Sequence, residues 1–382
     1  MSIRIRPDQN LSFQDQPEPL LAEQVPERIK EIDRDGEART LTTELTTFVA
    51  SDGDPRIETQ SAGIRSQLGE SFAVTSRLQN PQLGQHSFGP VMEATTIDSL
   101  GNRDERIDRP LEVEAFRPAH MALRVVPDDL PEQLRTPQFL ASPIERAEVG
   151  RGNRATTVFA PENRSVLWST AYPWSTCGRV DTPLGWGSGV VVGPRHILTV
   201  SHVVQWNNDG TTGWLRFQPS YFDGSAPFGD AWGVLTYYKF KVTGPTIDFV
   251  EGMFDYVVVV MNNRIGDITG WMGARGYTDG WDGGAYWTHV GYPGDLSGGN
   301  RPYWESGIGL DGSWWQFDAH EAMSHLGDVW PGQSGGPFFG WWSGEVGPRA
   351  VAVQSSQNPT ENNASGGQDL VDLVMQARND HP

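Results

Sequence analysis

The segment GSGVVVGPRHILTVSHVV, residues 187–204, contains two short apolar runs joined by a Gly-Pro-Arg-His turn. Short runs rich in β-branched residues and bounded by turn residues are typical of buried β-strands. The segment therefore predicts two antiparallel strands, the second of which ends just before His202. A histidine placed directly after an apolar strand suggests a specific role for its imidazole.

Apolar runs of the same kind continue from about residue 160 to the end of the chain, separated by Gly, Pro, Asn and Asp. Helical periodicity is nearly absent between them, so the spacing suits a β-sandwich or β-barrel. The exception is GGQDLVDLVMQAR (366–378), whose apolar residues fall on one helical face. We therefore expect an all-β domain with a C-terminal helix. Further strands are predicted at DYVVVVM (255–261), WTHVGYP (287–293), GPFFGWW (336–342) and RAVAVQS (349–355).

The composition changes near residue 155. All 15 Trp and 9 Tyr residues lie in 156–382, whereas 1–155 is acidic and poor in aromatic residues. A segment of that composition buries too little apolar surface to offset the entropy of ordering its chain. We expect 1–155 to be a poorly structured leader or a pro-segment, in which HMALRVV (120–126) and PQFLA (137–141) dock on the following domain.

Charge and cysteine content narrow the functional classes. A net charge of −19 argues against nucleic acid or an anionic membrane surface as the main partner. The one cysteine, Cys177, excludes an intramolecular disulfide, and we expect it to be a buried core residue. No run approaches the ~18 apolar residues of a membrane span, and residues 1–19 lack the apolar core of a signal peptide. No pattern predicts a metal or a cofactor.

The segment PGQSGGP (331–337) places Ser334 among glycines. Glycines permit a tight backbone path and a close approach of substrate. Amide hydrolysis through a serine needs a hydroxyl and two N–H groups directed at the developing oxyanion. The N–H groups of Gly332 and Ser334 are the candidates. The same letters also fit an ordinary turn between two strands.

A serine hydroxyl is a weak nucleophile unless a base lies beside it, and imidazole is the usual base. Of the eight histidines, His202 alone follows an apolar strand and begins a short helical turn. The base in turn needs a carboxylate that orients it. Asp255 directly precedes an apolar strand, where a carboxylate without a partner is costly. Asp248, in TIDFVEG, is the competing candidate.

Taken together, the segment 187–204, FDYVVVV (254–260), VGYPGD (290–295) and PGQSGGPFF (331–339) resemble the chymotrypsin superfamily of serine peptidases, most closely its glutamyl-endopeptidase branch. The resemblance covers roughly 160–382. It implies a double antiparallel β-barrel with the active site between the barrels. It also implies a secreted endopeptidase that acts on polypeptides, needs no cofactor and is made as a zymogen. In this chain it assigns the catalytic triad to His202, Asp255 and Ser334, and the oxyanion hole to Gly332 and Ser334.

The sequence departs from the family pattern at several positions. Gln333 stands where the animal enzymes carry the aspartate that captures a new N-terminus, so activation would have to work differently. Glutamyl endopeptidases usually bind the substrate carboxylate with a threonine and a histidine, and the matching positions here are Val329 and Gln354. Glutamate preference is therefore in doubt. The residues expected to line the substrate pocket are Asp328, Val329, Trp330, Gln354, Ser355 and Ser356.

Two alternatives remain open from the sequence. The chain could be a catalytically inactive relative that uses the peptidase fold for binding. Alternatively, it could be an enzyme that is always active, with residues 1–150 serving as a targeting or partner-binding arm.

Overall fold

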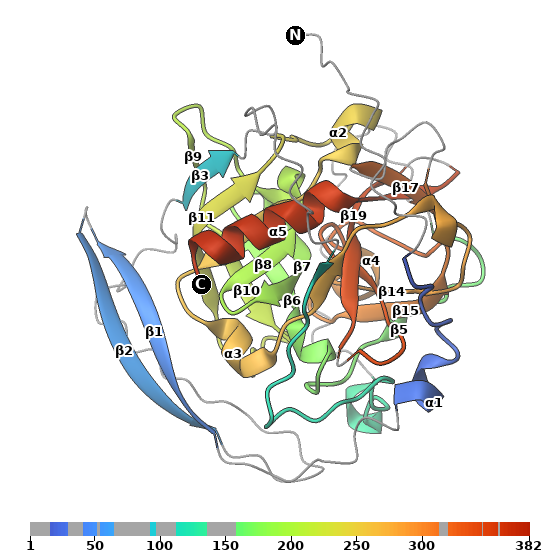
Figure 1. Cartoon of the computed structure of the whole chain (residues 1–382), viewed down its shortest axis with the longest axis horizontal. Helices are drawn as coiled ribbons and strands as arrows, with labels where there is room; N and C mark the ends of the chain where they lie inside the picture. The colour runs from blue at the N-terminus through green and yellow to red at the C-terminus, as the bar shows by residue number, and fades with distance from the viewer. Residues whose placement is uncertain are drawn as a thin grey trace.

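The computed structural model describes residues 16–29, 41–51, 54–64, 92–96, 112–135, 158–312, 320–345, 347–357 and 360–382. Two β-sheet bodies form the centre of the molecule, and one long C-terminal helix crosses in front of them (Figure 1).

The first body is a closed antiparallel barrel. Its strands follow the order β10-β6-β7-β8-β12-β11, and β11 pairs back with β10 to close the ring. The quoted segment 187–204 supplies the hairpin of β7 and β8, as predicted, with Val190 opposite Leu198. The valine side chains of β7 and β12 are buried on both faces of their strands, which explains their unbroken apolar runs. The strands are β6 Cys177–Thr182, β7 Gly185–Gly193, β8 His196–Thr199, β10 Arg216–Pro219, β11 Ala231–Tyr238 and β12 Val257–Met261, with β3 Met92–Thr96 and β9 Thr211–Thr212 added beyond β11.

The second body is a curved sheet with the order β16-β17-β20-β19-β18-β14-β15-β5. Its core is rich in tryptophan: Trp281, Trp287 and Trp342 lie in mutual contact and are buried. With the first barrel it gives the double β-barrel architecture that was predicted. The strands are β4 Glu112–Val113, β5 Ser165–Val166, β13 Gly273–Arg275, β14 Trp287–Gly291, β15 Tyr303–Ile308, β16 Leu310–Asp311, β17 Glu321–His325, β18 Pro337–Gly340, β19 Arg349–Gln357 and β20 Asn362–Gly366.

The C-terminal helix α5, Gln368–Asp380, is also confirmed. Leu370, Leu373, Val374 and Ala377 are fully buried on one face of it. No helix in the described ranges is both long and apolar enough to cross a membrane. The other helices are short: α1 Val25–Ile29, α2 Phe249–Met253, α3 Ile265–Thr269, α4 Gly294–Ser297, η3 Glu132–Leu134, η4 Trp174–Thr176, η5 Ser201–Val203 and η6 Asp279–Trp281.

Two stretches of the N-terminal region pack on the barrels. Residues 112–135 begin with β4, which pairs with β13 of the second sheet. The predicted docking segment 120–126 follows as turns and bends with an isolated bridge from Leu123 to Tyr172, and Met121 and Leu123 are buried. Residues 16–29 lie against the second sheet, where the indole N–H of Trp342 donates to a backbone carbonyl of this stretch. The strands β1 Leu41–Ser51 and β2 Asp54–Ile64 pair as an antiparallel hairpin. The segment 137–141 lies outside the described residues, and the domain boundary near 155 stays a prediction.

Candidate active site

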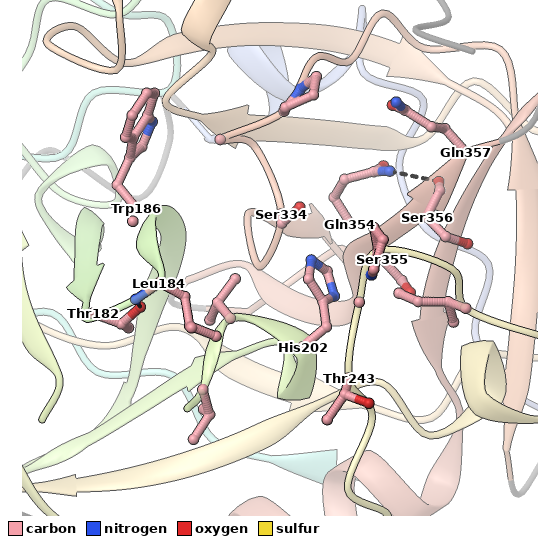
Figure 2. Close-up of a pocket in the computed structure, with 18 of the residues that line it drawn as sticks. Thr182, Leu184, Trp186, His202, Thr243, Ser334, Gln354, Ser355, Ser356 and Gln357 are labelled. Atoms are coloured by element: carbon pink, nitrogen blue, oxygen red, sulfur yellow. Dashed lines mark hydrogen bonds between the residues drawn. The ribbon is translucent and has the colours of Figure 1, made fainter. Parts of the chain in front are cut away.

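A cavity of about 830 Å³ lies between the two barrels. The first barrel contributes His202, on η5 directly after β8, and the second contributes Ser334, in the loop between β17 and β18. Figure 2 shows the imidazole of His202 beside the Ser334 loop in this cavity. Segments that are 132 residues apart in the sequence thus meet at one site.

Asp255 fixes the orientation of His202. Its side chain is completely buried, and its Oδ2 lies 2.6 Å from Nδ1 of His202. Oδ1 accepts the backbone N–H of His202 at 3.0 Å, and Ser355 Oγ donates to Oδ2 at 2.6 Å. Three donors therefore satisfy a carboxylate that burial would otherwise make costly. Because Nδ1 faces the carboxylate, Nε2 of His202 is the nitrogen available on the cavity side.

Asp248, the competing carboxylate, has a structural role. It caps the N-terminus of α2, where its side chain accepts the backbone N–H of Glu251 at 2.8 Å. The backbone N–H of Asp248 in turn donates to Oε2 of Glu251 at 3.0 Å, which completes a capping box. The partner of His202 is thus Asp255.

The loop around Ser334 is pressed against the first barrel. Gly335 adopts φ +85°, and a Cβ there would lie 2.2 Å from Thr199 Oγ1 and 2.3 Å from the carbonyl oxygen of Ser188. Ser188 on β7 holds the loop from the same side. Its backbone N–H donates to the carbonyl of Ser334 at 2.7 Å, and its hydroxyl donates to the carbonyl of Gly332 at 2.8 Å. Only glycine fits at position 335, because a side chain would meet both left-handed strain and β7.

The backbone N–H groups of Gly332 and Ser334 donate to no acceptor among the described residues. The carbonyl ends of the same two peptide units are bound. The carbonyl of Pro331 accepts the N–H of Gly294 at 2.9 Å, and that of Gln333 accepts the N–H of Gly336 at 2.9 Å. Since the N–H and C=O of a planar trans peptide point in opposite directions, these bonds fix the direction of both free N–H groups.

Most of the residues predicted for the substrate pocket line the cavity. Val329, Trp330, Gln354, Ser355 and Ser356 all contribute to its wall. Nε2 of His325, buried on β17, lies 2.9 Å from Oε1 of Gln354, and Gln354 Nε2 donates to the carbonyl of Ser356 at 3.0 Å. The Gln354 amide is therefore fixed in orientation from behind the wall.

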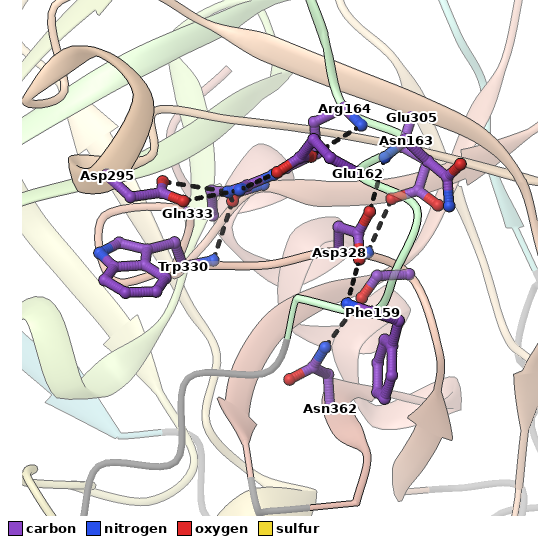
Figure 3. A network of polar contacts seen from close by, with 11 residues as sticks. Phe159, Glu162, Asn163, Arg164, Asp295, Glu305, Asp328, Trp330, Gln333 and Asn362 are labelled. Carbon is purple, nitrogen blue, oxygen red and sulfur yellow. Dashed lines mark hydrogen bonds and ion pairs between the residues drawn. The ribbon is translucent and has the colours of Figure 1, made fainter.

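The prediction that Asp328 lines the pocket is wrong. Asp328 is buried outside the cavity, where its carboxylate accepts the backbone N–H groups of Phe159 at 2.6 Å and Asn163 at 2.7 Å. These two N–H groups turn the carboxylate toward the start of the domain (Figure 3). Burial raises the pKa of Asp328, although the two N–H groups counteract it. The same surroundings raise the pKa of Glu305 to about 7, chiefly through burial.

Sequence reasoning missed three residues that surround the site. Ser188 holds the serine loop, as described above. Trp186, on β7, lines the cavity and donates its indole N–H to the carbonyl of Tyr292 at 3.1 Å. Arg164 donates to Oε1 of Gln333 at 2.8 Å and forms ion pairs with Asp295 and Glu162 (Figure 3). The Trp in WGSGVVV was visible in the sequence, but no local pattern connects Arg164 with Gln333.

The remaining nucleophile and base candidates lie in the core. Cys177 is buried, and burial raises the pKa of its thiol to about 12, which opposes a role as a thiolate. Burial lowers the pKa of His196 and of His289 to about 3 each. Both rings contact backbone carbonyls, those of Ala377 and Pro337 respectively. These groups serve the packing of the barrels.

Sequence and structure comparisons relate the chain to known proteins. No family model matches the chain. It is 26% identical over 211 residues to a glutamyl endopeptidase of Bacillus licheniformis, with 52% of this chain covered, and it spans about 61% of that relative's length. A solved structure of a Glu endopeptidase in complex with MPD is 19% identical, with TM-score 0.48, covering 58% of this chain and 100% of that one. The solved structure of protease Anisep from Arthrobacter nicotinovorans is 21% identical, with TM-score 0.40, and the match covers 53% of this chain and 93% of that one. The chain is thus similar in sequence, over about half of its length, to a glutamyl endopeptidase, and its strands form a double antiparallel β-barrel.

Proposed function

We propose that the protein is a serine endopeptidase in which Ser334 is the nucleophile, His202 the general base and Asp255 the residue that orients the base. One observation carries the proposal: a histidine held on Nδ1 by a buried carboxylate shares a cavity with a serine that is flanked by two free backbone N–H groups. Those three features are what acyl transfer from an amide requires.

In the proposed reaction, Ser334 Oγ attacks the carbonyl carbon of the scissile bond while its proton passes to Nε2 of His202. The N–H groups of Gly332 and Ser334 stabilise the oxyanion that forms. The C–N bond then breaks, and His202 donates the proton to the leaving amine. Water repeats the sequence on the acyl-enzyme and releases the acid. Asp255 stabilises the imidazolium at each stage.

The lining of the cavity suggests the substrate class. No Asp, Glu, Lys or Arg is among the described residues that form its wall. The wall combines apolar surfaces such as Leu184, Trp186 and Val329 with the fixed amide of Gln354. Charged side chains would be poorly solvated there. We therefore expect cleavage after neutral residues, and profiling with a peptide library of mixed side chains ahead of the scissile bond tests this.

A fluorophosphonate probe tests the proposed chemistry directly, because it labels only an activated serine. We expect the full chain to be labelled, and Ser334→Ala and His202→Ala to lose labelling. On a peptide substrate, either change should lower kcat by about 10⁶-fold, as in other triads. If the folded wild-type chain neither reacts with the probe nor cleaves any library peptide, the proposal is wrong and the inactive binding protein is favoured.

The zymogen assignment belongs to the same proposal. In the N-terminal stretches 16–29 and 112–135, no residue lines the cavity. Processing would therefore not act by removing these two stretches from the cleft. Mass spectrometry of the natural protein distinguishes the cases: a new N-terminus within about 145–165 supports a zymogen, whereas an intact chain supports an always-active enzyme with an arm.

A further inference from the structure

Arg164 lies at the centre of a buried polar network behind the serine loop (Figure 3). Its side chain is 1% exposed. One edge of the guanidinium donates to both oxygens of Asp295, at 3.2 and 2.7 Å, and Nη1 also donates to Oε1 of Gln333 at 2.8 Å. Burial alone would lower the pKa of Arg164, but hydrogen bonds with Glu162 and Asp295 outweigh it and raise that pKa. The charge is therefore permanent.

The first branch of the network reaches the Ser334 peptide. Oε1 of Gln333 accepts both the Arg164 guanidinium and the backbone N–H of Trp330, the latter at 2.9 Å. The Gln333 side chain, itself 1% exposed, is thus tied across the base of its own loop. The N–H of Ser334 belongs to the peptide unit whose carbonyl is that of Gln333. Fixing the side chain of Gln333 therefore restricts the orientation of this unit.

The second branch reaches the Gly332 peptide. Asp295 lies in α4, whose first residue, Gly294, donates its N–H to the carbonyl of Pro331 at 2.9 Å. That carbonyl belongs to the same peptide unit as the N–H of Gly332. The bidentate ion pair of Arg164 with Asp295 holds α4 in place. One guanidinium thus supports both free N–H groups through separate partners.

We infer that Arg164 is a positioning residue for the oxyanion hole, which orders the Gly332 and Ser334 N–H groups through Asp295 and Gln333. This inference rests on the proposed function. Arg164 follows Phe159 and Asn163 in the sequence, and the backbone N–H groups of those two residues donate to the buried Asp328. The start of the domain is therefore anchored beside the serine loop that Arg164 orders. The side chains of Arg164, Asp295 and Gln333 do not line the cavity, so we expect Arg164 to affect the chemical step rather than substrate binding.

The test compares Arg164→Met with Arg275→Met in the full chain. Arg275 is a matched control, because its side chain is also buried, at 5% exposed, and also pairs with two carboxylates, Glu112 and Glu345. It lies on β13 and does not line the cavity. We expect Arg164→Met to lower kcat about 10²-fold with KM within twofold, since displaced oxyanion donors cost that much. Arg275→Met should leave kcat and KM unchanged.

A peptide boronic acid, which mimics the tetrahedral intermediate, gives a second readout. In Arg164→Met the inhibition constant of this compound should rise by the same factor by which kcat/KM falls. Arg164→Lys keeps the positive charge but loses the planar, two-pronged guanidinium. Its kcat/KM and its inhibition constant should lie between those of Arg164→Met and those of the wild type. The inference is overturned if folded Arg164→Met retains kcat within threefold of wild type, or if its loss appears in KM alone.

Three further outcomes complete the test. If Arg164→Met does not fold, Asp295→Asn replaces it under the same criteria, with a drop of about tenfold in kcat expected from the loss of the charged pair. If the wild-type chain itself fails to react with the fluorophosphonate probe, the proposed function has failed. If wild type and Arg164→Met react at equal rates, only the role of Arg164 has failed.

Discussion

At the scale of single residues, the site depends on how a buried charge is satisfied. Asp255 has no exposed surface, yet it accepts donors from both barrels: the imidazole and backbone of His202 from the first, and the hydroxyl of Ser355 from the second. The carboxylate therefore orients the histidine and also links the two halves of the cleft. Hydrogen bonds to a charged group contribute about 1.5–3 kcal/mol each.

Ser355→Ala should lower kcat about tenfold, because one of three donors to the Asp255 carboxylate is lost while the imidazole contact remains. The lower end of the range for such a bond, about 1.5 kcal/mol, corresponds to roughly that factor in rate. Steady-state kinetics on a library-derived peptide measure it. Ser355→Thr keeps the hydroxyl and should restore most of the activity. An alanine variant with wild-type kcat would show that the Ser355 hydroxyl is not needed by Asp255.

Glu305 provides a pH-dependent prediction. Burial raises its pKa from 4.5 to about 7 in the folded state. A carboxyl whose pKa is higher when folded stabilises the fold below pH 4.5, and that contribution is lost as the pH rises toward 7. Glu305→Gln, which mimics the neutral form, should therefore be more stable than wild type above pH 7, by about 1–2 kcal/mol after allowance for screening.

Urea unfolding at pH 4.5 and at pH 8 checks this expectation. The two proteins should unfold at similar urea concentrations at the lower pH, where Glu305 is protonated in the folded state and already half protonated in the unfolded state. An equal difference at the two pH values would mean that the carboxyl of Glu305 does not titrate differently in the folded protein.

At the scale of elements, the loop between β17 and β18 takes its shape from contacts with β7 and β8. Gly335→Ala would combine φ +85° with a Cβ only 2.2 Å from Thr199 Oγ1. We expect a loss of stability of at least 1–3 kcal/mol, the usual cost of backbone strain, together with loss of probe labelling.

Gly344→Ala is the matched control for this change. Gly344 has nearly the same φ, +82°, but a Cβ there would meet nothing within 4 Å. Gly344→Ala should lose only the free energy of unfolding that the strained backbone costs, and it should keep full labelling by the fluorophosphonate probe. If both variants lose the same stability and keep labelling, the close approach of the loop to β8 is not required.

At the scale of the whole molecule, residues 112–135 behave as part of the barrel structure. β4 extends the second sheet beside β13, Val113 and Leu123 are buried, and Arg301 donates to the carbonyl of Leu134 at 2.6 Å. Each buried aliphatic side chain contributes about 1.5–3 kcal/mol. A leader attached in this way does not need a covalent bond to remain in place.

We therefore expect a nicked protein to stay together. A site for a sequence-specific protease is introduced between residues 136 and 157 and cut under native conditions, and size-exclusion chromatography then shows whether the two fragments co-elute. They should separate only in denaturant. Separation under native conditions would contradict the structural role of residues 112–135 and would favour a releasable pro-segment.

The sequence by itself determined the strands of the barrel region and the C-terminal helix. Residues 187–204 and 255–261 carry their β-strand pattern locally, since β-branched runs between turn residues depend on near neighbours. It also singled out His202, Asp255 and Ser334, because a polar residue at the end of a buried strand or among glycines stands out within a few positions.

Only the tertiary structure decided where the supporting groups point. Asp328 turns away from the cavity because the backbone of Phe159 and Asn163 binds it, and Arg164 reaches Gln333 across 169 residues of sequence. The direction of a buried carboxylate or a loop N–H follows from its hydrogen-bond partners. These partners come from segments that meet only when the barrels assemble, so no local pattern records them.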